Sequence, residues 1–336
     1  MKSKIKIWIA ELRAPFLTAT IVSVLLGTSI AWVRNNVFNW EYFLLALLGG
    51  AFLHLGTNIA NDYFDHKSGN DKINKEFVRP FSGGSRMIQL GLLSPRKVFA
   101  AALMFYAIAV FIGVYLAWAT GLFVLVLGIT GLLSGVFYTG PPFNWASRGV
   151  GEAFVGINFG ALMTLGAYYV QAKNLSIEPL IASIPISFLI AAVLYINEFP
   201  DYNADKAVGK NTLVVRLGRS RAVIGYGLIV IGSYVVILLN VLFGITPLYT
   251  LLALIPLPLA LRAVEVASKF HSEPSKLAPA NALTIIFHFL TSLLISLGYL
   301  SYRFEVMTPS FFLLIIIIGI CAFMTIYFCS KVKSPL

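Results

Sequence analysis

The sequence predicts an all-α fold, a polytopic bundle of helices that cross a membrane. Of its 336 residues, 58% are hydrophobic and only 12% are charged, whereas soluble domains carry about 25% charged residues. The apolar residues gather in runs long enough to cross roughly 30 Å of hydrocarbon. The basic residues lie between these runs and form no block, so the net charge of +11 indicates membrane topology and not a nucleic-acid partner.

Ten apolar runs are predicted to span the membrane. They fall at about 14–33, 41–61, 97–118, 121–138, 150–171, 178–198, 222–242, 247–264, 279–301 and 309–330. The first run has a basic start and no small-residue cleavage site, so we interpret it as an anchor and not as a removed signal peptide. In the eighth run, Pro256 and Pro258 predict a kink.

The distribution of lysine and arginine predicts the orientation. With the N-terminus inside, 22 of these 25 residues fall on the cytoplasmic side, and only Arg34, Lys173 and Arg303 fall outside. Cytoplasmic loops of membrane proteins carry such an excess of basic residues. We therefore expect both termini to be cytoplasmic.

Two acidic clusters follow the second and sixth runs, both on the predicted cytoplasmic side. Their helical spacing places three polar side chains of each cluster on one face of a helix. These sets are Asn58, Asn61 and Asp65, and Asn197, Asp201 and Asp205. Pro200 is expected to open the second helix. The recurrence of a similar motif after four further spans suggests an internal duplication.

Paired acidic clusters at a membrane surface are suited to magnesium and a diphosphate. Mg²⁺ takes one or two carboxylates together with substrate phosphate oxygens, and it can neutralise a leaving group. Basic side chains in the same loops could complete an anion site: Lys67, Lys72, Lys75, Arg79, Arg86, Lys206 and Lys210. The alternative is that the aspartates are solvated helix-end residues, which fits one such cluster better than two. His54, one turn before Asn58, either lines the cavity or is a buried structural ring.

These motifs resemble the UbiA superfamily of intramembrane aromatic prenyltransferases over about residues 10–301. The resemblance implies a nine-helix core, with both aspartate motifs at cytoplasmic helix ends around a cavity open laterally to lipid. We therefore expect a prenyltransferase domain at 1–301 and an additional helix and tail at 302–336. The segments that carry the resemblance are Asn61-Asp62-x-x-Asp65 with Asp71, Asp201-x-x-x-Asp205, Gly209-Lys210-Asn211-Thr212 and Tyr138-Thr-Gly-Pro-Pro142.

The resemblance and the spacing together assign the candidate site. The residues expected to hold Mg²⁺ are Asn61, Asp62, Asp65, Asp71, Asp201 and Asp205. The expected catalytic residues are Asp65, Asp201, Asp205 and Tyr138. The expected substrate-binding residues are Asn58, Asn61, Lys67, Lys75, Arg79, Arg86, Asn197, Lys206 and Lys210.

One departure from the family pattern points to a branch. The commonest first motif ends in an aspartate where this chain has Gly69, and Asp71 comes two residues later. That spacing is similar to the 1,4-dihydroxy-2-naphthoate prenyltransferases of menaquinone synthesis. Arg79 and Arg86 flank the Gly83-Gly84 turn, and we expect one of them to orient the acceptor or the diphosphate; the alternative is pairing with lipid phosphates.

The sequence thus predicts Mg²⁺-dependent transfer from a polyprenyl diphosphate to a small aromatic acceptor, in contact with membrane lipid. The first acceptor to consider is 1,4-dihydroxy-2-naphthoate. Other acceptors, such as a hydroxybenzoate or a glycerol phosphate lipid, and cyclisation of the chain remain open. A secondary transporter is the alternative from another class, but transporter sites lie near the midplane on broken helices.

Overall fold

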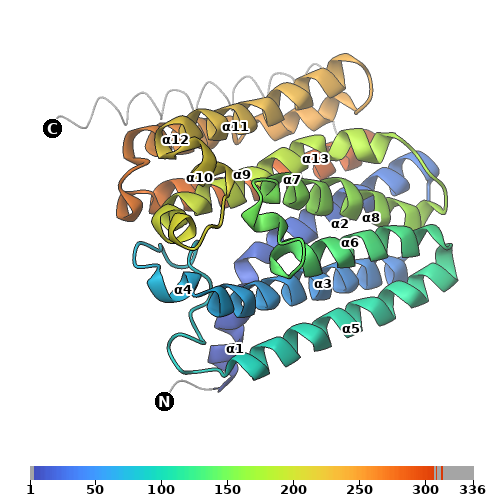
Figure 1. The fold of residues 1–336 in the computed structure, drawn as a ribbon. Coiled ribbons are helices and arrows are strands. Elements are labelled where there is room, and N and C mark those ends of the chain that lie inside the picture. The colour runs from blue at the N-terminus through green and yellow to red at the C-terminus, as the bar shows by residue number, and fades with distance from the viewer. Residues whose placement is uncertain (1–3, 306–307, 309–311, 313–336) are drawn as a thin grey trace.

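The computed structural model describes residues 4–305, 308 and 312, and every regular element in this part of the chain is helical (Figure 1). In chain order the elements are α1 (Lys4–Leu12), η1 (Ala14–Leu17), α2 (Thr18–Asn35), α3 (Trp40–Ser68), α4 (Asn70–Ile73), α5 (Pro95–Thr120), α6 (Phe123–Thr139), η2 (Trp145–Ser147), α7 (Gly151–Val155), η3 (Gly156–Leu162), α8 (Met163–Ala172), α9 (Glu178–Ala207), α10 (Leu213–Leu217), α11 (Arg219–Leu242), η4 (Leu248–Leu254), α12 (Leu257–Phe270), η5 (Pro274–Lys276) and α13 (Ala278–Arg303).

Eight helical segments of the described chain are long and apolar enough to cross a membrane. The 17 residues of α6 make a shorter ninth helix in the same bundle. The all-α membrane bundle predicted from the sequence is thereby confirmed. The tenth run, at 309–330, lies outside the described residues apart from position 312, so the additional C-terminal helix stays a prediction.

Local sequence signals explain several helix boundaries. Asn39 caps α3 by accepting a hydrogen bond from the Tyr42 backbone N–H at 3.0 Å. Gly69 ends the same helix in a left-handed conformation with φ of 82°. The kink predicted at Pro256 and Pro258 is confirmed, because the 3₁₀ helix η4 gives way there to α12.

The prediction that Pro200 opens its helix is wrong. The helix α9 continues through Pro200 to Ala207. Proline removes one backbone donor from a helix, but Phe199 and Pro200 are fully packed among neighbouring helices. Tertiary packing holds this turn in place, and Asp201 and Asp205 therefore lie one turn apart on the same helix.

The helix α9 forms the centre of the bundle, where it packs against α2, α11, α13 and η3. Glycines allow the closest of these approaches. A Cβ at Gly160 would lie 1.9 Å from Ser187 Oγ of α9, and one at Gly156 would lie 2.8 Å from the Ser187 carbonyl oxygen. The element η3 is a π-helix, a form that often occurs at functional sites.

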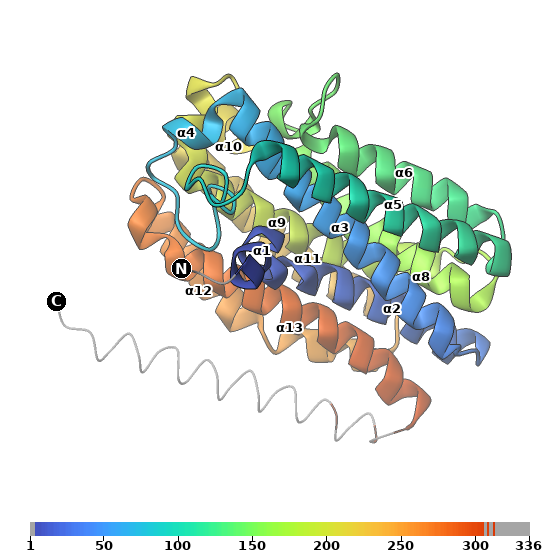
Figure 2. The ribbon, with the colours of Figure 1, turned by 90° about the horizontal axis from the view of Figure 1, so that it is seen from below.

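Figures 1 and 2 both place α1, α4 and α10 at the same end of the bundle. The acidic ends of α3 and α9 lie at this end as well, and the connection 69–94 covers it. The two motifs that the sequence separates by four spans are thus brought together in space.

Candidate active site

A cavity of about 560 Å³ runs into the bundle from the acidic ends of α3 and α9. Polar side chains of both motifs line its mouth. Its far part is lined by apolar residues near the opposite ends of α5, α6 and α8, among them Leu116, Val124 and Val170. The cavity therefore joins a polar site at one surface to a long apolar chamber.

The structure brings most of the candidate site residues to this cavity, but not all of them. Those that line it are Asn58, Asn61, Asp65, Asp71, Tyr138, Asn197, Asp201, Asp205 and Lys210. Those that do not line it are Asp62, Lys67, Lys75, Arg79, Arg86 and Lys206. Of the second set, Asp62 is buried, Arg86 is half-buried, and the other four side chains are exposed.

Lys210 connects the two motifs. Its Nζ lies 3.4 Å from Asp65 Oδ2, on α3, and 3.7 Å from Asp205 Oδ1, on α9. Burial alone would lower the pKa of this ammonium, but the carboxylates of Asp205 and Asp65 outweigh burial and raise its pKa well above the ordinary value. Lys210 is therefore a fixed positive charge between the two acidic helix ends.

The connection after α3 reaches across the cavity mouth to α9. Asn70 Nδ2 donates to Asp205 Oδ1 at 2.7 Å, and Asn74 Nδ2 donates to Asp201 Oδ1 at 2.7 Å. The backbone N–H of Gly83 donates to the other oxygen of Asp201 at 3.2 Å. Sequence reasoning missed Asn70 and Asn74, because nothing in their local spacing indicates a partner more than a hundred residues away.

Asp62 does not line the cavity, and its carboxylate is held by this same connection and by Arg13. Its Oδ2 accepts a hydrogen bond from the Ser85 backbone N–H at 2.9 Å, and its Oδ1 lies 3.7 Å from Arg13 Nη1. On a helix of about 3.6 residues per turn Asp62 is rotated by about 100° from Asn61, and its carboxylate is directed to Ser85 and Arg13. The structure thus separates Asp62 from the other predicted metal ligands.

Asp71 lines the cavity, and Arg86, which does not line it, contacts Asp71. Its carboxylate accepts from Gln89 Nε2 at 2.8 Å, and Arg86 donates to the backbone oxygens of Asp71 and Asn74. Burial, with the negative charges of Asp65 and Asp62, raises the pKa of Asp71 to about 8. Arg86 therefore has partners inside its own connection and does not reach the cavity.

The charges around the cavity leave a surplus of carboxylates. In the described part of the chain, five acidic side chains line it against two basic ones, Arg13 and Lys210. No group of three His, Cys, Asp or Glu side chains among the described residues could hold a metal ion alone. Mg²⁺ commonly binds through one or two carboxylates plus substrate phosphates, so facing pairs of aspartates fit it together with a diphosphate.

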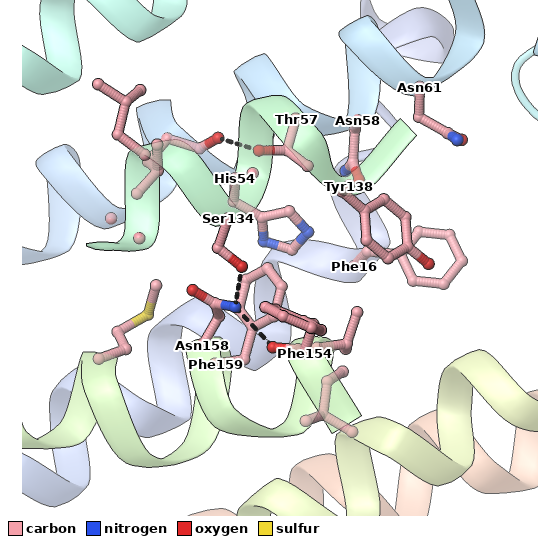
Figure 3. Close-up of a pocket in the computed structure, with 18 of the residues that line it drawn as sticks. Phe16, His54, Thr57, Asn58, Asn61, Ser134, Tyr138, Phe154, Asn158 and Phe159 are labelled. Atoms are coloured by element: carbon pink, nitrogen blue, oxygen red, sulfur yellow. Dashed lines mark hydrogen bonds between the residues drawn. The ribbon is translucent and has the colours of Figure 1, made fainter. Parts of the chain in front are cut away.

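The chamber next to this mouth combines aromatic and polar side chains (Figure 3). Tyr138 and Phe16 face it beside Asn58, and the His54 ring lies one turn deeper. His54 Nδ1 and Thr20 Oγ1 share a hydrogen bond of 3.0 Å. His54 thus both lines the cavity and is anchored in the bundle, which joins the two alternatives raised by the sequence.

The π-helix contributes a further polar group to the chamber. Asn158 Nδ2 donates to Ser134 Oγ and to the Phe154 carbonyl, each at 2.6 Å. Its Oδ1 is buried and has no hydrogen-bond partner among the described residues. Neither side chain belongs to one of the two acidic motifs, so reasoning from those motifs did not single them out.

Residues 20–283 match the model of the UbiA prenyltransferase family. The chain belongs to this family. It is a multi-pass membrane prenyltransferase, and the resemblance inferred from its motifs is confirmed.

Two relatives whose names state an activity support the assignment to this family. The chain is 27% identical over 296 residues to a 2-carboxy-1,4-naphthoquinone phytyltransferase from Synechocystis, covering 88% of this chain and 93% of the relative. It is 29% identical over 302 residues to the 1,4-dihydroxy-2-naphthoate octaprenyltransferase of Escherichia coli, covering 88% and 96%.

Solved structures share the fold at lower identity. A UbiA homologue from Aeropyrum pernix in its apo form matches with a TM-score of 0.63 at 15% identity, covering 84% of this chain and 96% of that one. A homologue from Archaeoglobus fulgidus bound to DMAPP and Mg²⁺ matches with a TM-score of 0.52 at 18% identity, covering 86% and 99%.

Proposed function

We propose that this UbiA-family enzyme transfers a polyprenyl group from an isoprenyl diphosphate to 1,4-dihydroxy-2-naphthoate, with Mg²⁺ as cofactor. The observation that carries the proposal is the pair of acidic helix ends at the mouth of an apolar cavity, with Lys210 between Asp65 and Asp205. Two relatives named for naphthoate-type acceptors, at 27% and 29% identity, support the choice of acceptor.

The residues around the mouth have distinct roles in the proposal. Asn61 and Asp65 on one side, with Asp201 and Asp205 on the other, would hold Mg²⁺ and the diphosphate. Bound Mg²⁺ supplies positive charge that stabilises the diphosphate as it leaves. Lys210 donates to diphosphate oxygens, and the N–H groups of Asn70 and Asn74 hold the carboxylates of α9 in a fixed orientation.

The chamber carries the second half of the reaction. Its apolar wall holds the isoprenyl tail and keeps water from the allylic cation that forms when the C–O bond breaks. Tyr138 presents an aromatic ring to the chamber next to the mouth, where its π-face stabilises positive charge. An electron-rich carbon of the acceptor then takes the cation, and the ring loses a proton.

A defined assay tests the proposal. The full-length protein in lipid nanodiscs is given Mg²⁺, a series of prenyl diphosphates and each candidate acceptor, and the products are identified by mass. We expect a prenylated naphthalene product that requires both Mg²⁺ and naphthoate. Products formed only with a hydroxybenzoate or a glycerol phosphate lipid, or a cyclised prenyl chain without acceptor, would refute the assigned acceptor.

We also propose that the acidic helix ends and the N-terminus face the cytoplasm, as the excess of basic residues on that side indicates. Ser68 and Asn174 are exposed and lie at opposite ends of the bundle. Single cysteines at these positions, in a background without Cys321 and Cys329, should react with a membrane-impermeant thiol reagent from opposite sides. Reaction of Asn174→Cys from the cytoplasmic side would contradict the orientation.

A further inference from the structure

We propose that Arg13 binds the carboxylate of the aromatic acceptor and thereby selects acceptors that carry one. The inference rests on the proposed function, because it assigns a part of the same site. It also moves acceptor recognition from the connection after α3, where the sequence suggested Arg79 or Arg86, to the first turn before α2.

Arg13 occupies an unusual position in the backbone. It lies between α1 and η1 with φ of 52° and ψ of 44°, the left-handed region that non-glycine residues seldom adopt. Such a conformation costs about 1–2 kcal/mol. The break turns the chain from α1 into the bundle and brings the Arg13 side chain to the cavity, where it is the only lining arginine among the described residues.

Among the described residues, the guanidinium of Arg13 has no hydrogen-bond partner. Four arginine side chains in the described chain are half-buried, and Arg86, Arg219 and Arg303 each donate two hydrogen bonds to the protein. Arg13 donates none to the described residues, and its Nε is buried without a partner. A buried donor without a partner costs free energy, so this group is suited to a ligand.

In the part of the chain that the structure describes, the guanidinium has one ion-pair partner and one ring contact, and Glu11 and His54 are near enough to interact with its charge. Asp62 Oδ1 lies 3.7 Å from Nη1, too far for a hydrogen bond, and the Phe16 ring lies 5.0 Å from the guanidinium carbon. Because Asp62 approaches from the Nη1 side, the edge formed by Nε and Nη2 makes no hydrogen bond to the described residues. A carboxylate fits such an edge with two parallel hydrogen bonds.

The surroundings favour an acceptor carboxylate over the diphosphate. The proposed diphosphate site lies where Lys210 joins Asp65 and Asp205, whereas Arg13 pairs with Asp62, which does not line the cavity. Phe16, which contacts Arg13, lines the same chamber as Tyr138 (Figure 3). An aromatic ring held by its carboxylate on Arg13 would therefore pack against Phe16 and lie next to the departing carbon.

The test compares two acceptors in two variants. Arg13→Lys keeps the charge but loses the planar guanidinium that can form two parallel hydrogen bonds to a carboxylate. Arg13→Asn removes the charge, and asparagine tolerates the left-handed backbone. Steady-state constants are measured for 1,4-dihydroxy-2-naphthoate and for 1,4-dihydroxynaphthalene, which lacks the carboxylate, and for the prenyl diphosphate. Arg96→Gln, at an exposed arginine on the same end of the bundle, is the matched control.

We expect both Arg13 variants to raise KM for the naphthoate by about 10- to 100-fold. The constants for 1,4-dihydroxynaphthalene and for the donor should change less than about threefold, and Arg96→Gln should match the wild type. An increase confined to the donor KM would assign Arg13 to the diphosphate and overturn the inference. An equal loss with both acceptors, together with a lower melting temperature, would show a structural role and also overturn it.

The proposed function fails separately. If the wild-type enzyme turns over no aromatic carboxylate, the proposed function is refuted before any variant is compared, and the inference falls with it. If the wild type is active and the variants keep its preference for the carboxylate, only the inference about Arg13 is refuted.

Discussion

The two acidic helix ends have similar sequences but very different surroundings. In the most apolar window of α9, 67% of the residues are buried, against 28% in that of α3. The side chain of Asp205 is 2% exposed, whereas that of Asp65 is 18% exposed. One half of the site is therefore built on the central helix of the bundle, and the other on a helix that faces lipid.

The difference shows how the site is assembled. The α9 half is packed among α2, α11, α13 and η3, and its carboxylates accept hydrogen bonds from outside the helix. The α3 half runs on into the connection 69–94, which supplies the donors Asn70, Asn74 and the Gly83 N–H to the carboxylates of α9. The central helix α9 thus provides a packed base for the site, and the connection 69–94, which continues from α3, covers the carboxylates of α9.

The largest expected effect distinguishes loss of catalysis from loss of the contact between the connection 69–94 and α9. Asp65→Ala and Asp205→Ala should each lower kcat/KM at least about 1000-fold, about 4 kcal/mol of transition-state stabilisation, because each removes a proposed magnesium ligand. Only Asp205→Ala also removes the partner of Asn70, so only this variant should speed limited proteolysis within 69–94.

Product formation and cleavage rates are measured on the same preparations, with the exposed Glu273→Gln as control. Near wild-type turnover by either alanine variant would contradict the facing pairs. Equal protease sensitivity of the two variants would contradict the difference between the two halves.

An intermediate effect is expected at the covering connection. Gly84 and Gly91 both have φ of +67°, so alanine at either position carries the same backbone strain of about 1 kcal/mol. A Cβ at Gly84 would lie 2.8 Å from Asp62 Oδ1, whereas one at Gly91 would meet nothing within 4 Å. Gly84→Ala should therefore lower kcat/KM about 10-fold and Gly91→Ala by less than about twofold. Equal losses in steady-state assays would show that the Asp62 contact does not position the connection.

The smallest effect concerns Glu11, which joins α1 to the same connection through Ser85. Burial, with the negative charge of Asp62, raises the pKa of Glu11 from 4.5 to about 7. The folded protein then holds a proton that the unfolded chain releases, so stability is lost as pH rises from about 4.5 to about 7. Glu11→Gln should match the wild-type melting temperature at pH 5 and exceed it by a few degrees at pH 8. A difference that is the same at both pH values would contradict the assigned cause; Glu273→Gln is the control.

The sequence was sufficient to predict the fold and the placement of site residues along each of the two helices. Hydropathy gave the helices, and helical spacing correctly placed Asn61 with Asp65 and Asp201 with Asp205 on cavity-facing surfaces. Helical spacing does not exclude Asp62, because residues three apart share a helix face, and the family motif groups it with Asp65 as a ligand. That grouping remains a prediction that the observed orientation of Asp62 does not favour.

What the sequence could not give were contacts between distant segments. The hydrogen bond from Asn70 to Asp205 spans 135 positions, and no local pattern encodes it. The direction of the Arg13 side chain likewise depends on a left-handed backbone conformation, which its neighbours in the sequence do not specify. Arg79 and Arg86 were predicted from their charge and their place beside the Gly83-Gly84 turn, and neither property reveals which side chain reaches a cavity.

The length of α3 sets the depth at which the enzyme works. Its exposed Trp40 is suited to one lipid–water boundary, and Asn61 lies 21 residues further along, about 32 Å at 1.5 Å per residue. That distance is close to the thickness of the hydrocarbon layer. A prenyl diphosphate in the bilayer keeps its charged head among lipid headgroups and its chain among acyl tails. Such a donor can enter sideways at its own depth, without the cost of about 0.8 kcal/mol per CH₂ for exposing its chain to water.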